Sequence, residues 1–255
     1  MDGAETQPLL LHTPAEHQGD VLTGQTEPNS ATGDHLVLSG VKVPLGPHIT
    51  PEILRNLRAG TYERPEARVI RERLDSSDVV VEIGGGIGYT SALCAKRVDS
   101  ADVHVYEADP RLENPIRELY RLNRVSPDLH MCGLGLREET RGLHVAADFW
   151  ESSFVRPKAA VSSRISVQVR AFDSEIASYP RCPNFLIVDI EGGEYEFCRG
   201  VSLDGFDKVL CEVHPQMLGR RRLWGIRRAL EKRGFRRDEA CSTSKVWYFE
   251  RDHEQ

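Results

Sequence analysis

The sequence lacks the long apolar run that a membrane-spanning helix requires. No stretch approaches the roughly 20 apolar residues that such a helix needs, so we expect no membrane segment. The N-terminus has no basic segment followed by an apolar one, which argues against a signal peptide. The six cysteines are scattered without a C-x-x-C pair, and reduced thiols in the core are the simplest interpretation. We therefore expect a cytoplasmic protein.

An excess of positive charge is also missing. The net charge is −6 at pH 7, so no global field draws the protein toward nucleic acid. One segment is nevertheless basic, and its charged residues are Arg220, Arg221, Arg222, Arg227, Arg228, Lys232, Arg233, Arg236 and Arg237. A solvated helix face balanced by nearby acids is the favoured interpretation. RNA or an anionic small molecule is the alternative partner, although no aromatic residues are interleaved for base stacking.

The chain of 255 residues is long enough for one α/β domain with additions. Residues 1–34 are polar and lack periodicity, which predicts a disordered or loosely packed N-terminal tail. Residues 35–77 carry two predicted helices that we expect to form a small N-terminal cap. Residues 78–255 alternate strand and helix patterns and end in a predicted antiparallel hairpin, which is typical of a doubly wound α/β sheet.

A glycine-rich turn follows an apolar strand near the start of this core. Residues 79–83 are β-branched apart from Glu82, and Gly84, Gly86 and Gly88 follow them. Glycine has no Cβ and tolerates positive φ, so a nucleotide-like ligand can approach such a backbone closely. The turn therefore predicts a site for a nucleotide-like cofactor.

The spacing of the glycines separates two cofactor classes. A dinucleotide loop reads G-x-G-x-x-G, which would place the third glycine where this chain has Tyr89. The glycine comes one residue earlier, at Gly88, and Glu82 would repel a pyrophosphate. S-adenosylmethionine has a cationic amino-acid moiety and no phosphate, so Glu82 suits it better. We predict S-adenosylmethionine as the cofactor, and a nicotinamide oxidoreductase is the alternative.

An acid at the end of the next predicted strand supports a nucleoside site. Residues 103–106 read as a strand, and Glu107 follows it about twenty residues after Gly88. A carboxylate in this position can accept hydrogen bonds from both ribose hydroxyls. Glu107 is therefore a predicted cofactor-binding residue, although both cofactor classes share this feature.

Two later predicted strands each end in a short segment that contains acidic residues, the second with a histidine, and we call these segments the acidic steps. The first gives Asp189 and Glu191, and the second gives Glu212 and His214. The polar residues of each step are two apart, so they project to one side while strand geometry lasts. Ligands of open α/β sheets bind at the carboxyl ends of strands, so we expect these side chains to converge beside the glycine turn. Ordinary salt-bridged or capping acids are the alternative, which we favour for Glu194.

These motifs together resemble the FkbM family of S-adenosylmethionine-dependent methyltransferases. The resemblance rests on Glu82-Ile83-Gly84-Gly85-Gly86-Ile87-Gly88, Tyr106-Glu107-Ala108-Asp109-Pro110, Asn123, Phe185-Leu186-Ile187-Val188-Asp189-Ile190-Glu191-Gly192-Gly193-Glu194 and Glu212-Val213-His214, within residues 60–249. Many members have Asp at the position of Glu82. The resemblance implies a Rossmann-like class I methyltransferase fold, and usually O-methylation of a hydroxyl on a sugar, polyketide or other secondary metabolite. Ala108 is assigned to the cofactor site, and Tyr62 could close over the cofactor or pack under the cap.

Methyl transfer to a hydroxyl needs a base within about 3 Å of the departing proton. His214 is the predicted base, because an imidazole titrates near neutral pH. Asp189 is the alternative base or orients the acceptor, and Glu191 completes the predicted catalytic set. With Glu212 these residues could also hold Mg²⁺, although no spacing demands a metal.

The acceptor is expected to be a small molecule. Trp150 and Glu212 are the predicted acceptor contacts, since a tryptophan beside hydroxyls can wall a pocket. Trp150 could equally anchor a surface hairpin. N-methylation of an amine, which needs no strong base, stays open, and so does a non-catalytic binding module on the same fold.

Overall fold

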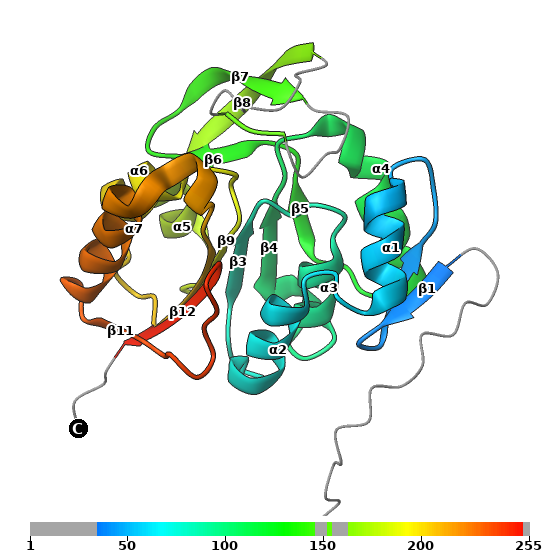
Figure 1. Ribbon diagram of the computed structural model, residues 1–255, viewed down its shortest axis with the longest axis horizontal. Helices are drawn as coiled ribbons and strands as arrows, with labels where there is room; N and C mark the ends of the chain where they lie inside the picture. Colours follow the sequence, from blue (N-terminus) through cyan, green and yellow to red (C-terminus); the bar gives the residue numbers. More distant parts are fainter. Residues whose placement is uncertain (1–34, 146–151, 155–162, 252–255) are drawn as a thin grey trace, which may run out of the picture.

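A seven-stranded mixed β-sheet runs through the centre of the protein (Figure 1). The computed structural model describes residues 35–145, 152–154 and 163–251. In spatial order the strands are β11 (Phe235–Arg237), β12 (Val246–Arg251), β10 (Lys208–Glu212), β9 (Phe185–Val188), β3 (Val80–Ile83), β4 (Val103–Tyr106) and β5 (Asp128–His130). Strand β12 is antiparallel to both neighbours, and the other pairs are parallel. The predicted doubly wound, Rossmann-like sheet with a closing antiparallel hairpin is confirmed.

The direction in which successive strands are added to the sheet reverses between β3 and β9. From β3 the chain moves outward through β4 and β5, and β9 then returns to the other side of β3. Ile83 pairs with Val188, so Gly84 and Asp189 leave the sheet side by side. Ligands of open α/β sheets bind in the crevice at such a reversal. The topology thus brings the glycine turn and the first acidic step to one point.

Helices cover both faces of the sheet (Figure 1). One face carries α1 (Pro51–Ala59), α2 (Arg64–Arg73), α3 (Tyr89–Ala95) and α4 (Glu113–Asn123), and the other carries α5 (Phe172–Ser178), α6 (Glu194–Gly200) and α7 (Pro215–Glu231). Alternate strand residues point to opposite sides, so Val80 joins one buried apolar cluster and Val81 the other. This is why the strand before the glycine turn is apolar throughout. None of the described helices is long and apolar enough to cross a membrane.

A second sheet of three strands lies above the carboxyl edge of the central sheet (Figure 1). Its order is β6 (Gly133–Gly135), β8 (Ser163–Ala171) and β7 (Glu139–Val145). The pattern of residues 130–136 predicts one continuous strand, and this prediction is wrong, because the segment is divided between two sheets. The chain turns after β5, where the amide of Cys132 donates to the carbonyl of His130 (3.0 Å), and β6 then pairs with β8.

An antiparallel hairpin and two helices precede the glycine turn. Strands β1 (His35–Leu38) and β2 (Val41–Pro44) form the hairpin. Helix α1 begins after Thr50, whose hydroxyl accepts a hydrogen bond from the amide of Ile53 (3.5 Å), and ends at Gly60 in the left-handed region. Ile53 and Leu57 pack into the same apolar cluster as the central strands. These elements therefore share the core of the sheet.

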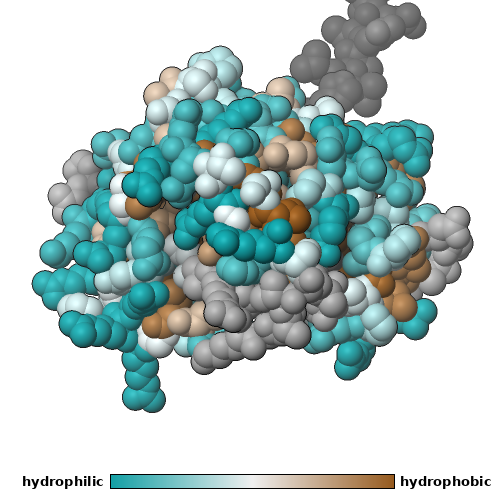
Figure 2. Space-filling model, turned by 90° about the horizontal axis from the view of Figure 1, so that it is seen from above, coloured by the Kyte–Doolittle hydropathy of each residue, from teal (hydrophilic) through white to brown (hydrophobic). Residues whose placement is uncertain are grey.

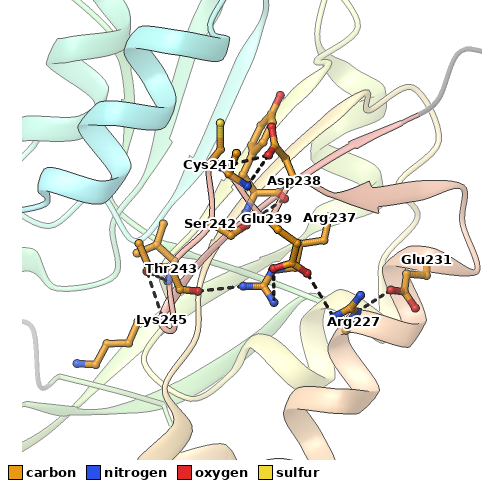
Figure 3. Close-up of polar contacts among 12 residues, drawn as sticks. Arg227, Glu231, Arg237, Asp238, Glu239, Cys241, Ser242, Thr243 and Lys245 are labelled. Carbon is orange, nitrogen blue, oxygen red and sulfur yellow. Dashed lines mark hydrogen bonds and ion pairs between the residues drawn. The ribbon is translucent and has the colours of Figure 1, made fainter.

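Side chains fix the turn of the closing hairpin (Figure 3). Asp238 Oδ1 accepts hydrogen bonds from the amides of Ala240 (2.8 Å) and Cys241 (3.1 Å). Thr243 Oγ1 accepts one from the amide of Val246 (2.9 Å) at the start of β12. Short polar side chains of this kind stabilise turns by satisfying backbone donors, so the turn sets the register of β12.

Candidate active site

A cavity of about 840 Å³ opens where the carboxyl ends of β3 and β9 meet. Residues after β3, β4 and β9 form its inner wall, and residues of β6, β7, α6 and α7 contribute to its outer wall. Seen from above, this face of the molecule is mostly hydrophilic, with small apolar areas between polar side chains (Figure 2). A volume of this size accommodates a cofactor-sized ligand.

Three of the four glycines of the turn, Gly84, Gly86 and Gly88, have distinct positions. Their φ angles are all positive, at +89° for Gly84, +53° for Gly86 and +81° for Gly88. A Cβ on Gly84 would lie 1.8 Å from the carbonyl oxygen of Asp189, so only glycine lets the two strand ends approach. Gly84 and Gly86 line the cavity, whereas Gly88 is buried against Ile116 of α4. The first two glycines thus form the wall, and the third permits close helix packing.

Glu107 binds the backbone of the glycine turn. Its Oε2 accepts a hydrogen bond from the amide of Gly86 (2.8 Å), and its Oε1 accepts one from the amide of Asp109 (2.6 Å). Glu107 lines the cavity, and burial raises its pKa to about 7. A pyrophosphate would need the turn amide that Glu107 occupies. The arrangement therefore disfavours a dinucleotide.

Glu82 lies in β3, just before the turn, and does not line the cavity. Its side chain is buried, and its Oε2 has no hydrogen-bond partner among the described residues. Burial, together with the charge of Glu63, raises the pKa of Glu82 well above its usual range. The predicted direct contact between Glu82 and the cofactor does not fit this position, because the carboxylate is buried and does not line the cavity.

Tyr62 and Glu63 reach the cavity from the N-terminal segment. Glu63 adopts a left-handed conformation (φ +43°) directly before α2, and its carboxylate accepts a hydrogen bond from the hydroxyl of Thr90. Burial raises the pKa of Glu63 to about 7. The ring of Tyr62 packs edge-on against Tyr89, with 5.8 Å between centroids. Tyr62 and Ala108 both line the cavity, as their predicted roles require.

His214 lies behind the cavity within a group of four carboxylates. Its Nδ1 is 2.5 Å from Glu194 Oε1, and its Nε2 is 3.2 Å from Glu191 Oε2. Oxygens of Asp189 and Glu212 lie 4.0 and 3.8 Å from Nε2. Burial alone lowers the pKa of His214, but the hydrogen bonds to Glu191 and Glu194 and the charge of Asp189 outweigh it and raise this pKa to about 11. The imidazole is therefore charged at neutral pH.

Asp189 and Glu191 face the cavity, whereas His214 does not. Their side chains are 39% and 21% exposed, against 5% for His214. Burial and the charges of Glu212 and Glu191 raise the pKa of Asp189 well above its usual range. Glu191 has φ +45°, a strained conformation of the kind that proteins concentrate at functional sites. The predicted role of His214 as the direct base does not fit, since both ring nitrogens face carboxylates and the ring does not line the cavity.

The structure thus brings the four predicted side chains of the two acidic steps together. Ligand atoms of Asp189, Glu212 and His214 lie within 4.8 Å of one another. A protonated imidazole cannot coordinate a metal, which argues against His214 as a metal ligand. A Mg²⁺ site among the carboxylates stays a prediction. Glu212 contacts this cluster and does not line the cavity, which leaves its predicted acceptor contact without support. Trp150 lies outside the described residues.

Sequence reasoning missed two residues of the site. Glu194, interpreted as a capping acid, is fully buried, and its Oε1 faces both His214 and the amide of Gly192 (2.9 Å). The sequence signal for Glu194 was the acidic segment 189–194. Its three acids are Asp189, Glu191 and Glu194, and Glu194 is the first residue of α6. Glu63 belonged to the upstream part of the resemblance, but nothing in its spacing indicated that it enters the cavity.

Acids pair with part of the basic segment of α7 and β11 (Figure 3). Arg227 lies 2.7 Å from Glu231 and 3.5 Å from Glu239, which also lies 3.4 Å from Arg237. These pairs support the interpretation of a balanced, solvated helix face rather than a free basic surface for RNA.

A comparison with known protein families gives the site its chemistry. Residues 78–237, more than half of the chain, match the sequence model of the methyltransferase FkbM domain. The chain belongs to the FkbM methyltransferase family. It is therefore a methyltransferase, and the predicted use of S-adenosylmethionine agrees with this family. No curated protein sequence matches the chain at a significant level.

Several solved structures are similar to this fold at low identity. Precorrin-6y C5,15-methyltransferase from Geobacter metallireducens is 12% identical, with 73% of this chain and 86% of that chain covered and a TM-score of 0.41. TYW2 from M. jannaschii in complex with AdoMet is 14% identical, with 89% of each chain covered and a TM-score of 0.42. The ribosomal protein L11 methylase from Lactobacillus delbrueckii subsp. bulgaricus is 14% identical, with 76% and 80% covered and a TM-score of 0.42. The family match, not these similarities, carries the assignment.

The residues of the cavity fit S-adenosylmethionine. Acidic residues after β4 and β9 line the inner wall (Glu107, Asp109, Asp189 and Glu191), and Glu63 joins them from the N-terminal segment. This acidic wall complements the ammonium and sulfonium groups of the cofactor, which brings no phosphate into the site. The turn amide that a phosphate would require is already bound by Glu107.

Proposed function

We propose that the protein transfers a methyl group to a hydroxyl of a small molecule, such as a sugar, a polyketide or another secondary metabolite. The observation that carries the proposal is the meeting of Gly84 and Asp189 at the reversal point of the sheet. A cofactor-binding turn and a titratable carboxylate thereby border one cavity. Apolar groups of Leu134, Leu136 and Phe154 also line it, and such mixed linings are typical of small-molecule pockets.

The inner wall would hold the cofactor through its carboxylates. Glu107 keeps lone pairs free for ribose hydroxyls after it has bound the turn amides, because each carboxylate oxygen can accept two hydrogen bonds. Glu63 and Asp189 would attract the cationic methionine end. S-adenosylmethionine, when bound, supplies an activated methyl group on its sulfonium.

Asp189 is the residue we assign as the base. It lines the cavity, and its Oδ1 has no hydrogen-bond partner among the described residues. Its raised pKa moves proton uptake toward neutral pH, where a general base works best. The charged imidazole of His214, 4.0 Å from Oδ1, would hold the carboxylate in place. His214 is thus a positioning residue, and Glu191 orients it from the cavity side.

A transfer assay with labelled S-adenosylmethionine tests this function. Wild type should methylate members of a panel of hydroxylated small molecules. Asp189→Asn keeps the side-chain shape and removes the base, so kcat should fall at least about a hundredfold. The exposed change Asp204→Asn, outside the cavity lining, is the matched control and should leave kcat unchanged.

The same assay distinguishes the alternatives. Transfer to amines but not to hydroxyls would replace O-methylation by N-methylation. An Asp189→Asn variant with wild-type kcat would remove Asp189 as the base. Salt-sensitive transfer to RNA would move the acceptor to another class of molecule.

A further inference from the structure

A second group of metal-ligating side chains lies on the edge of the central sheet, outside the cavity lining. It consists of His104 on β4 and Asp128 and His130 on β5. One ligand atom from each lies within 4.8 Å of the other two. Neither the family assignment nor the methyl-transfer chemistry uses these three residues.

The parallel ladder explains why they meet. His104 pairs with Asp128, and Tyr106 pairs with His130 in the next register position on the same face. Asp128 Oδ2 is 3.2 Å from Nδ1 of His104 and 2.9 Å from Nε2 of His130. One carboxylate oxygen therefore lies between two ring nitrogens that come from neighbouring strands.

These separations suit a tetrahedral metal ion. Ligands at 2.0–2.1 Å from Zn²⁺ in tetrahedral geometry lie roughly 3.3 Å from one another. Two imidazoles and one carboxylate are a donor set that Zn²⁺ and related transition ions prefer over Mg²⁺ or Ca²⁺.

Two tyrosines hold the imidazoles in place. The ring of Tyr179 stacks on His104 at 3.7 Å between centroids, and the ring of Tyr106 stacks on His130 at 4.6 Å. The hydroxyls of the two tyrosines are hydrogen-bonded to each other. Ligands whose orientation is fixed by surrounding packing lose little freedom on binding a metal.

We propose that His104, Asp128 and His130 bind a divalent transition-metal ion of the zinc class. Asp128 is half exposed, so water can enter from its side and complete four-coordination. The ion would tie the edge strand β5, which has only three residues, to β4. The site is structural, and it does not depend on the proposed acceptor or on methyl transfer.

Cobalt and zinc binding to the full-length, untagged chain tests the proposal. Co²⁺ in a four-coordinate protein site gives strong visible absorption, and Zn²⁺ should displace it at one equivalent per chain. Zn²⁺ should also raise the melting temperature of the wild type. Asp128→Asn should weaken binding about a hundredfold and abolish the shift in melting temperature. His104→Gln combined with His130→Gln should remove the absorption altogether.

Control variants distinguish metal binding at this site from metal binding by other residues of the chain. His48→Gln changes a partly buried histidine outside the cluster and should bind Co²⁺ like the wild type. His214→Gln alters the cluster behind the cavity and should also keep the absorption. Loss of the absorption in His214→Gln with retention in Asp128→Asn would overturn the proposal. Absence of the absorption in the wild type, or equal affinity in a folded Asp128→Asn variant, would do the same.

Discussion

Nδ1 of His214 lies 2.5 Å from Oε1 of Glu194, a carboxylate that is 0% exposed. Because Glu194 does not line the cavity, the proposed mechanism gives it an indirect role through His214. The pair keeps a charged imidazole directly behind Asp189. A buried acid in the first turn of α6 thereby supports a carboxylate at the cavity wall.

Glu194→Gln should impair turnover more than cofactor binding. Loss of the charged partner lowers the pKa of His214, so the positioning of Asp189 fails as pH rises. We expect kcat to fall about tenfold to a hundredfold, with an earlier fall at alkaline pH than in the wild type. Breaking a buried charged pair also costs about 3–5 kcal/mol of folding free energy, which a melting curve would show.

The exposed change Glu231→Gln on α7 is the control for this variant. It removes a carboxylate that pairs with Arg227 at the surface, and it should alter neither kcat nor its pH profile. A folded Glu194→Gln protein with the wild-type pH profile would show that the buried pair is only structural.

The sequence predicted the parts of this site that depend on backbone geometry. Gly84 must be glycine because Asp189 approaches it, and that need is visible as a glycine run after an apolar strand. The convergence of the acidic steps with the turn followed from the rule that ligands bind at the carboxyl ends of strands.

The orientation of individual side chains could not be predicted in the same way. Strand alternation ends with β9 at Val188, and the chain then turns, with Glu191 in a left-handed conformation. Whether His214 or Asp189 faces the cavity depends on that turn and on α6. The burial of the Glu82 side chain and the end of β5 at His130 likewise depend on tertiary packing, which local sequence patterns do not predict.

Cofactor affinity should rise with pH. Burial raises the pKa values of Glu63 and Glu107 to about 7 in the unliganded cavity, and a bound cation favours their charged forms. These groups must lose protons on binding, so affinity increases from pH 6 to pH 8 by about tenfold for each group that ionises. Calorimetry at pH 6 in buffers of different ionisation enthalpy should detect the released protons. In Glu63→Gln the pH dependence should be shallower, and a pH-independent affinity in the wild type would contradict this account.

Gly84→Ala should disrupt the reversal point. The added Cβ would meet the carbonyl oxygen of Asp189 at 1.8 Å, in addition to the strain of a positive φ. We expect a loss of about 3 kcal/mol or more in folding free energy, or loss of cofactor binding in the folded fraction. Gly40→Ala is a matched control, since Gly40 has φ +78° and no atom within 4 Å of the added Cβ. It should cost only about 1–2 kcal/mol from backbone strain.

The central claim is that this cavity binds S-adenosylmethionine with Glu107 at the ribose, and titration calorimetry tests it most directly. Wild type should bind one equivalent of S-adenosylmethionine and should not bind NADH. Glu107→Ala should bind at least about tenfold more weakly, a loss of roughly 1.4 kcal/mol or more. The surface change Glu113→Ala, which removes an exposed pair with Arg117, should retain wild-type affinity. Wild-type affinity in a folded Glu107→Ala protein, or no binding by the wild type, would contradict the account.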